Sequence, residues 1–528
     1  MKLFFDNRIP VRLMIMILFF EALITSSTSC TKKFDQLNTD PTSFSSLPPA
    51  AIPKALARVQ YEGVYGDPGG YELIHSLFTD LWSQYFADAG GSPSDRNVIN
   101  QDWIISQWNL TYTVNWPSLK LVIDATEGVA PAANAIAKIW KVYIFHQNAD
   151  FYGPIPYFQA GLGTLTIPYD SQEAVYMDFF KTLDSAITVL KNADPTQTPF
   201  GTDDMIYHGD ISKWIKFANS LKLRLALRVS AVDGAMAQHE AEAAVAGGVM
   251  LTNDDNAFVD VTSNPNSSNG LCDEAPWQNM RMSATMEGYL KGFNDPRLQE
   301  YYSPADQDGQ YHGLRNGLAP TDVTNATVIG GTFQGAVNLS NINLDRWNPL
   351  TDGTTKLNVI YSAESYFLRA EGALNGWNMG GNALDFYTQG ITLSLQQWGI
   401  TDNTTIQNYI NGTSAPAALT DYLHSPAVAN IPVKFAADAA TQRQQILTQK
   451  WLALFPDGIE AWAEVRRTGF PILYPVVHSD NPDVPTTDII RRFTFVQYEY
   501  ETNGKATQAA VSLLNGPDKA NTHVWWNK

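Results

Sequence analysis

DISKWIKFANSLKLRLALRVS, residues 210–230, is the stretch around which the rest of the chain is organised. Apolar side chains recur in it at steps of three and four residues, which predicts one apolar helix face: Trp214, Phe217, Leu221 and Leu225. Leu223 and Leu227 add a second apolar stripe, so we expect neighbouring elements to cover this helix on more than one side. Asp210 or Ser212 can cap its first turn.

The polar side of the same helix is basic, although the protein as a whole is acidic. Its cations are Lys213, Lys216, Lys222, Arg224 and Arg228. We therefore expect a central scaffold helix whose cations meet carboxylates from neighbouring helices. Arg466 and Arg467, on a later predicted helix, are interpreted in the same way, as ion-paired structural residues.

Helical periodicity extends over much of the chain and predicts a mainly α fold. The predicted helices cover residues 55–60, 71–86, 106–129, 131–148, 172–192, 235–246, 362–374, 383–398, 436–455 and 458–467. Several of them follow one another closely enough to form hairpins, as in tetratricopeptide-type units. We expect one domain over residues 53–528, with a hairpin scaffold at about 53–250 and 359–470.

Residues 251–358 interrupt this pattern, because Asn, Gly, Pro, Ser and Asp dominate there and only Met280–Gly292 has helical spacing. A long irregular segment inside a compact protein is more often functional than idle. We therefore expect an irregular insert on the ligand side of the scaffold. Residues 471–528 are predicted to form an extended tail.

Composition restricts the function. The 528 residues carry a net charge of −18, and only 17% of them are charged. An acidic chain of this kind argues against nucleic acid as a partner. The eight histidines are scattered, and no metal-ligand spacing, nucleophile elbow or phosphate-binding glycine loop is present, so we predict neither a metal, a cofactor nor an enzyme.

The N-terminus has the pattern of an export signal. A basic start precedes the apolar run Leu13–Ile24, which is too short to span a bilayer comfortably. Cys30 then follows small residues, as in bacterial lipoprotein signals. We predict a signal peptide over residues 1–29, acylation of Cys30, and a tether over residues 30–52; a disulfide between Cys30 and Cys272 is the alternative.

Five stretches together resemble the SusD/RagB family of outer-membrane glycan-binding lipoproteins, particularly its second branch. They are FDQLNTDPT (34–42), WIKFANSLKLRLALRVS (214–230), FNDPRL (293–298), QKWLALFPDGIEAWAEVRRTGFP (449–471) and WWNK (525–528). The resemblance implies a tetratricopeptide-like scaffold and a binding protein that is not a catalyst. It also implies a lipid-anchored, surface-exposed lid on a SusC-like TonB-dependent transporter that helps to capture oligosaccharides.

Aromatic rings in loops are the candidate ligand contacts, because a pyranose stacks its C–H face on a ring while polar side chains bind its hydroxyls. The predicted site residues are Trp277, Trp347, Tyr311, Asp273 and Arg346 in the insert, and Arg96 and Asn97 in a loop after an early helix. For each indole the alternative is packing of the insert onto the helices.

Other functions remain open from the sequence. A surface glycan-processing enzyme, a binder of peptides or other nutrients, and an adhesin could use the same scaffold. The sequence does not identify the glycan.

Overall fold

The computed structural model describes residues 48–528 except residues 165, 262–267, 330–331, 334–335, 349–354 and 422. The predicted signal peptide, Cys30 and nearly all of the predicted tether lie outside the described residues. Pro49–Lys528 forms one compact unit. Within this described part, no helix is long and apolar enough to cross a bilayer.

The organising stretch forms helix α10 (Ile211–Arg228), and Asp210 caps it by accepting hydrogen bonds from the backbone N–H groups of Ser212 (2.9 Å) and Lys213 (3.1 Å). Both predicted apolar stripes are fully buried. Neighbouring elements therefore cover the helix on more than one side, which confirms the prediction.

The fold is mainly α, as predicted. Before the insert the elements are η2 (Pro49–Ala51), α3 (Ile52–Glu62), α4 (Pro68–Tyr71), the π-helical η3 (Glu72–Thr79), α5 (Asp80–Trp82), strand β1 (Phe86–Asp88), η4 (Pro93–Arg96), α6 (Gln101–Asn109), the π-helical η5 (Leu110–Asn115), α7 (Trp116–Thr126), α8 (Pro131–Tyr152), α9 (Gln172–Lys191), η6 (Gly201–Asp203), α10 and α11 (Gly234–Gly247). After the insert they are α16 (Ser362–Leu374), α17 (Ala383–Gln397), α18 (Asn403–Ile410), α19 (Ala439–Leu454), α20 (Gly458–Thr468), α21 (Gln497–Thr502) and α22 (Gly504–Val511).

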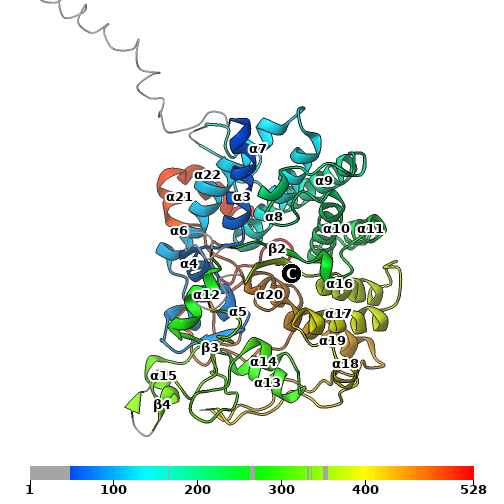
Figure 1. Cartoon of the computed structure of the whole chain (residues 1–528). Coiled ribbons are helices and arrows are strands. Elements are labelled where there is room, and N and C mark those ends of the chain that lie inside the picture. Colours follow the sequence, from blue (N-terminus) through cyan, green and yellow to red (C-terminus); the bar gives the residue numbers. More distant parts are fainter. Residues whose placement is uncertain are drawn as a thin grey trace, which may run out of the picture. The chain divides into compact units, whose positions relative to one another are not determined.

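Neighbouring helices pack as a continuous series. Helix α8 packs on α9, α9 on α10, and α10 on α11; α16 then packs on α10, α17 and α19. Figure 1 shows these helices following one another around α20. Segments on the two sides of the insert therefore form one scaffold.

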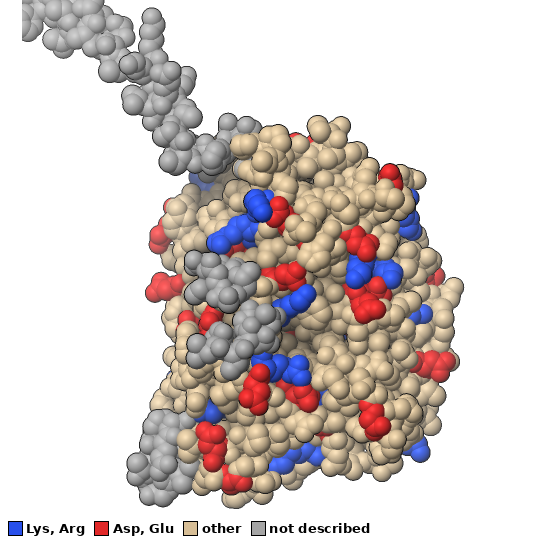
Figure 2. All heavy atoms as spheres, viewed as in Figure 1, with Lys and Arg blue, Asp and Glu red and all other residues tan. Residues whose placement is uncertain are grey.

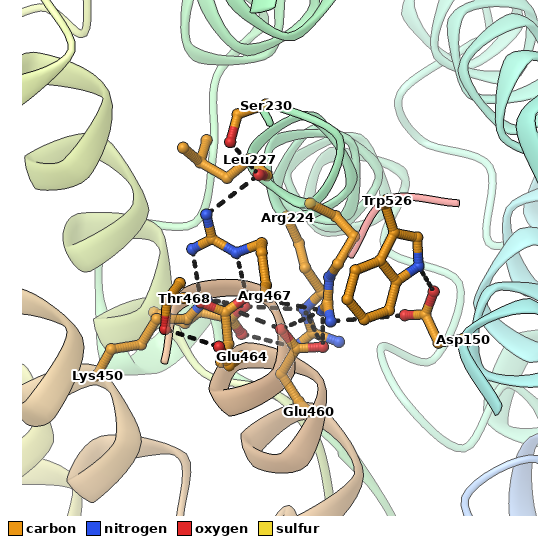
Figure 3. Close-up of polar contacts among 12 residues, drawn as sticks. Asp150, Arg224, Leu227, Ser230, Lys450, Glu460, Glu464, Arg467, Thr468 and Trp526 are labelled. Carbon is orange, nitrogen blue, oxygen red and sulfur yellow. Dashed lines mark hydrogen bonds and ion pairs between the residues drawn. The ribbon is translucent and has the colours of Figure 1, made fainter. Parts of the chain in front are cut away.

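A buried ionic network joins α10 to this series (Figure 3). Arg224 binds both carboxylate oxygens of Glu364 on α16, with N–O distances of 2.8 and 2.6 Å. Arg228 donates to Glu460 on α20 at 2.6 Å. The cations of the organising helix thus meet carboxylates from its neighbours, as predicted.

A second part of the network lies on α20. Arg467 pairs with Glu464 and with Glu371 of α16, each at 2.7 Å. Lys450 of α19 lies 3.1 Å from Glu464. Burial alone would raise the pKa of Glu464, but Arg467 and Lys450 hold it well below its usual range. The carboxylate therefore stays ionised inside the protein.

The C-terminus closes onto the same network. Trp526 is fully buried and donates from its indole N–H to Asp150 of α8 at 2.8 Å. The carboxylate of Asp150 lies 3.6 Å from Arg228. Arg466, which we expected to be ion-paired, instead donates to the backbone carbonyls of Asp150 and Arg491 and stacks its guanidinium on the ring of Trp462.

The insert contains more regular structure than its sequence indicates, but every element in it is short. The elements are η7 (Asn253–Asp255), β2 (Ala257–Val259), α12 (Gly270–Glu274), η8 (Ala275–Trp277), β3 (Met280–Met282), α13 (Ala284–Gly292), α14 (Leu298–Tyr301), α15 (Pro320–Thr327), β4 (Val328–Ile329), β5 (Thr332–Phe333) and β6 (Leu357–Ile360). The strands form antiparallel pairs β1–β3, β2–β6 and β4–β5. In the β1–β3 pair one strand lies outside the insert, and in the β2–β6 pair the two strands lie at opposite ends of it. A local sequence pattern cannot indicate such distant pairing.

The C-terminal stretch also differs from the expected extended tail, because it contains α21 and α22. Thr507 of α22 donates to the carbonyls of Glu499 and Asn503, which links the two helices. Tyr500 and Arg492 both bind Asp518. These local polar contacts stabilise a compact end to the chain.

We predict that Arg228→Met lowers the free energy of unfolding by about 3–5 kcal/mol, because it removes the nearest cation from the buried carboxylates of Glu460 and Asp150. Urea unfolding at pH 7 measures the change. Lys120→Met is the control, since it breaks the solvent-exposed pair with Asp124 and should cost about 0–1 kcal/mol. Equal losses in the two variants would show that the network does not stabilise the fold.

Candidate ligand-binding cleft

Two segments far apart in the sequence form the walls of a surface cleft. Strand β1, after the early helices, pairs with β3 in the insert, with Phe86 opposite Met282 and Asp88 opposite Met280. The backbone N–H of Ala89 extends the pairing by donating to Asn279 at 2.8 Å. This ladder holds the loop after β1 against the turn that carries Trp277.

Trp277 presents an open ring face, since 50% of the residue is exposed. The residues on either side of it are nevertheless held by hydrogen bonds. The Ala275 carbonyl accepts from the side chain of Asn341 at 3.0 Å, and the side-chain Oε1 of Gln278, a residue in the left-handed region, accepts from Arg281 at 2.8 Å. The indole is therefore a positioned aromatic platform at the surface.

Asp88 organises the opposite wall. Its carboxylate accepts from the backbone N–H groups of Gly90 (2.5 Å) and Ser92 (2.6 Å). Burial raises the pKa of Asp88, while these two hydrogen bonds act in the opposite direction. The side chain thus holds the loop that forms the rim of the cleft.

Glu274 lies among the lining residues of the cleft and is 7% exposed. Ser76 donates a hydrogen bond to its Oε2, while Oε1 has no hydrogen-bond partner among the described residues. Burial, and the nearby carboxylates of Glu72 and Asp80, raise the pKa of Glu274 well above its ordinary value. This carboxyl therefore retains its proton, and can donate as well as accept a hydrogen bond, to a higher pH than an ordinary glutamate.

The cleft has a volume of about 290 Å³. Its lining combines rings, amides and carboxyls: Glu72, Ser76, Leu77, Phe86, Asp88, Gly90, Ser92, Pro93, Trp103, Leu271, Glu274, Ala275, Trp277, Asn279, Met280, Asn341 and Ile342. Among these described residues there is no Lys, Arg or His. The arrangement can bind a polar, uncharged molecule with an apolar face.

The structure does not bring the predicted site residues together in one site. Of these, only Trp277 lines the cleft, while Arg346 and Trp347 line a second, larger cavity. Trp347 is 2% exposed and its ring packs against Trp398 and Phe455. Asp273 accepts from Ser268 at 2.6 Å.

Three further predicted residues lie elsewhere. Tyr311 is half-buried, and its carbonyl accepts from Lys291. Arg96 is 6% exposed, and its guanidinium pairs with Asp480 at 2.6 Å. Asn97 caps η4 in the left-handed region and donates to Ser479. The loop that contains Arg96 and Asn97 does line the cleft, but with Gly90, Ser92 and Pro93.

Sequence reasoning missed Asp88, Trp103 and Glu274. The spacing of Asp88 before Gly90 and Ser92 is the pattern of a carboxylate that binds the backbone of its own turn. Nothing local indicates that this turn meets Trp277, because that depends on the β1–β3 pairing. Among the residues that the structure describes, no three or more His, Cys, Asp or Glu side chains form a group that could hold a metal ion.

The family model described as SusD-like, Susd and RagB outer membrane lipoprotein, matches residues 49–527. No curated protein matches the chain.

Solved structures resemble the whole described unit. A chitin-binding SusD homolog from Flavobacterium johnsoniae is 34% identical, with a TM-score of 0.82 over 90% of this chain and 98% of that one. A SusD-like protein from Bacteroides thetaiotaomicron is 33% identical, with a TM-score of 0.80 and the same coverage. A SusD homolog from Bacteroides uniformis is also 33% identical, with a TM-score of 0.80 over 91% of this chain and 100% of that one.

The raised pKa of Glu274 predicts a pH-dependent effect of Glu274→Gln. Above about pH 4.5 the unfolded chain ionises this carboxyl, while the raised pKa lets the folded protein retain the proton to higher pH, so wild-type stability falls as pH rises through that window. Glutamine does not titrate. We therefore expect the variant to gain stability relative to wild type between pH 5 and 8, by up to about 1.4 kcal/mol per pH unit.

Urea unfolding at pH 5, 6.5 and 8 measures this difference. Glu173→Gln, which changes an exposed carboxyl at the start of α9, is the control. A stability difference between Glu274→Gln and wild type that stays constant over this range would contradict a neutral Glu274.

Proposed function

Because the chain belongs to the SusD-like family of outer membrane lipoproteins, we propose that it binds oligosaccharides at the cell surface through the cleft at Trp277. The observation that carries this proposal is the half-exposed indole on a fixed backbone, beside polar side chains. A surface ring of this kind stacks on the C–H face of a pyranose, and amides and carboxyls bind its hydroxyls. The chitin-binding relative supports the same class of ligand.

The charges of the cleft favour a neutral or amino sugar over an acidic one. Glu72, Asp88 and Glu274 contribute carboxyls, and the described lining contains no cation to pair with a uronate or sulfate. Figure 2 shows that most of the surface in view is uncharged and that acidic and basic side chains lie close together on it. The net charge of −18 disfavours the approach of an anionic polymer.

Trp277→Ala should weaken binding of a neutral chitooligosaccharide about tenfold or more, because loss of one stacking ring corresponds to about 1.4 kcal/mol. Isothermal titration calorimetry with chitohexaose measures the change.

Tyr498→Ala is the matched control, because Tyr498 is also 50% exposed but does not line the cleft. It should bind as wild type does. An oligogalacturonate of equal length should bind more weakly than chitohexaose. Equal affinities of wild type and Trp277→Ala for every glycan tested would rule out this cleft as the binding site.

We propose further that the protein is anchored through an acylated Cys30 and caps a SusC-like TonB-dependent transporter. Several acyl chains hold a protein firmly to a membrane where one does not. A glycan held in the cleft would be delivered when the lid closes on the barrel. Partner or ligand contacts must differ between the open and closed states to drive that motion.

Detergent extraction of the tagged native protein should co-purify a large outer-membrane barrel, and Cys30→Ala should release the protein into the soluble fraction. Mass spectrometry of the purified complex and of the N-terminal peptide checks both results. Recovery of unacylated protein with no barrel would contradict the anchor and the lid.

Glycan hydrolysis is the competing function, since two carboxyls of the cleft, Glu72 and Glu274, are near enough to interact electrostatically. Incubation with the same glycans distinguishes glycan hydrolysis from glycan binding. New reducing ends would indicate an enzyme, and unchanged glycans would support binding alone.

A further inference from the structure

A cavity of about 560 Å³ lies next to the cleft and shares Leu271 with it. One side of its lining comes from scaffold helices, including Tyr143 and Gln147 of α8. The other side comes from the insert and the residues around it, including Trp347 and Leu357. Its volume is within the range of about 300–1,000 Å³ that is usual for ligand pockets.

Two buried polar side chains on α8 line this cavity without a partner. Tyr143 and Gln147 are four residues apart, which places them on one face of the helix. Each residue is 4% exposed. Neither the hydroxyl of Tyr143 nor the amide of Gln147 makes a hydrogen bond to another described residue. Buried polar groups of this kind are normally satisfied, so the pair indicates an occupant that can exchange hydrogen bonds.

The charged groups of the lining are already neutralised within the protein. Arg346 pairs with Glu300, and Lys356 pairs with Asp260 at 2.6 Å. Deeper in the cavity, Arg224 pairs with Glu364 at 2.6 Å. Two of the remaining carboxyls of the lining also have partners: Glu460 binds Arg228, and Asp457 accepts a hydrogen bond from the backbone N–H of Glu460. The third, Asp345, is exposed to solvent. Little charge is left for an ionic ligand to pair with.

Aromatic rings line the same space. They belong to Tyr65, Tyr71, Tyr143, Phe258, Trp347, Tyr361 and Trp398. Rings combined with a free hydroxyl and a free amide form the chemistry that recognises a small molecule with an apolar face and several hydroxyls.

We propose that this cavity is a second binding site, separate from the Trp277 cleft, for a neutral mono- or disaccharide. The proposal shares the ligand class of the proposed function but does not depend on Trp277. Water is the competing occupant, because a polar cavity of this size has room for several water molecules. A sugar would displace water from the ring faces and satisfy the polar pair on α8.

The test compares three proteins by calorimetry with N-acetylglucosamine, chitobiose and cellobiose as probes. Wild type and Trp277→Ala should bind at least one probe with equal affinity at the cavity. The double variant Tyr143→Phe, Gln147→Met should bind that probe about fivefold to 150-fold more weakly, since it removes two hydrogen bonds of about 0.5–1.5 kcal/mol each. It should bind chitohexaose at the cleft as wild type does.

Tyr152→Phe is the matched control, because it removes a buried hydroxyl from the same helix that bonds to Ile104 rather than lining the cavity. It should keep probe binding. Asn358→Trp replaces the double variant in the test if the double variant does not fold. It adds a ring to the cavity lining from β6 and should also abolish probe binding.

Two results would overturn the proposal. One is that Trp277→Ala binds none of the three probes, which leaves water as the occupant. The other is that probe binding survives in the double variant or, where that does not fold, in Asn358→Trp. Loss of chitohexaose binding in Trp277→Ala concerns the cleft alone, so the two proposals fail separately.

Discussion

The buried ionic network around α10 is the interaction on which the rest of the structure depends. Arg224 and Arg228 are almost completely removed from water, so each must find carboxylates in well-defined positions. Those carboxylates come from α8, α16 and α20, and Trp526 binds one of them from the C-terminus. Because a buried charge without its partner is costly, the network constrains how these helices pack together.

This scaffold supports an irregular part that contributes to both proposed binding sites. The cleft and the cavity both use helix residues on one side and insert residues on the other. In the cleft a held turn presents an exposed ring, and in the cavity a helix presents two polar groups that have no hydrogen-bond partner among the described residues. At both sites the packing of the scaffold helices sets the positions of the side chains that a ligand would contact.

Helical periodicity was sufficient to predict the fold, because α10 and its neighbours bury stripes that are visible in the local sequence. The basic face of α10 likewise predicted that its partners would be carboxylates, but not which carboxylates they are. Local context was less informative for the two loop indoles. APWQN and DRWNP look equally polar, yet Trp277 is exposed and Trp347 is buried, since the partners of Trp347 at positions 398 and 455 are distant in sequence. Arg96 shows the same effect through Asp480.

The three-residue ladder between β1 and β3 has a consequence for how such proteins diversify. Side chains alternate across a strand, so inserting or deleting one residue in either segment would turn the neighbouring side chains to the opposite face. Length changes in the flanking loops would leave the pairing intact and reshape only the rim. Exchange of loop sequences can therefore reshape the rim of the cleft, while the short ladder keeps the two walls in the same register.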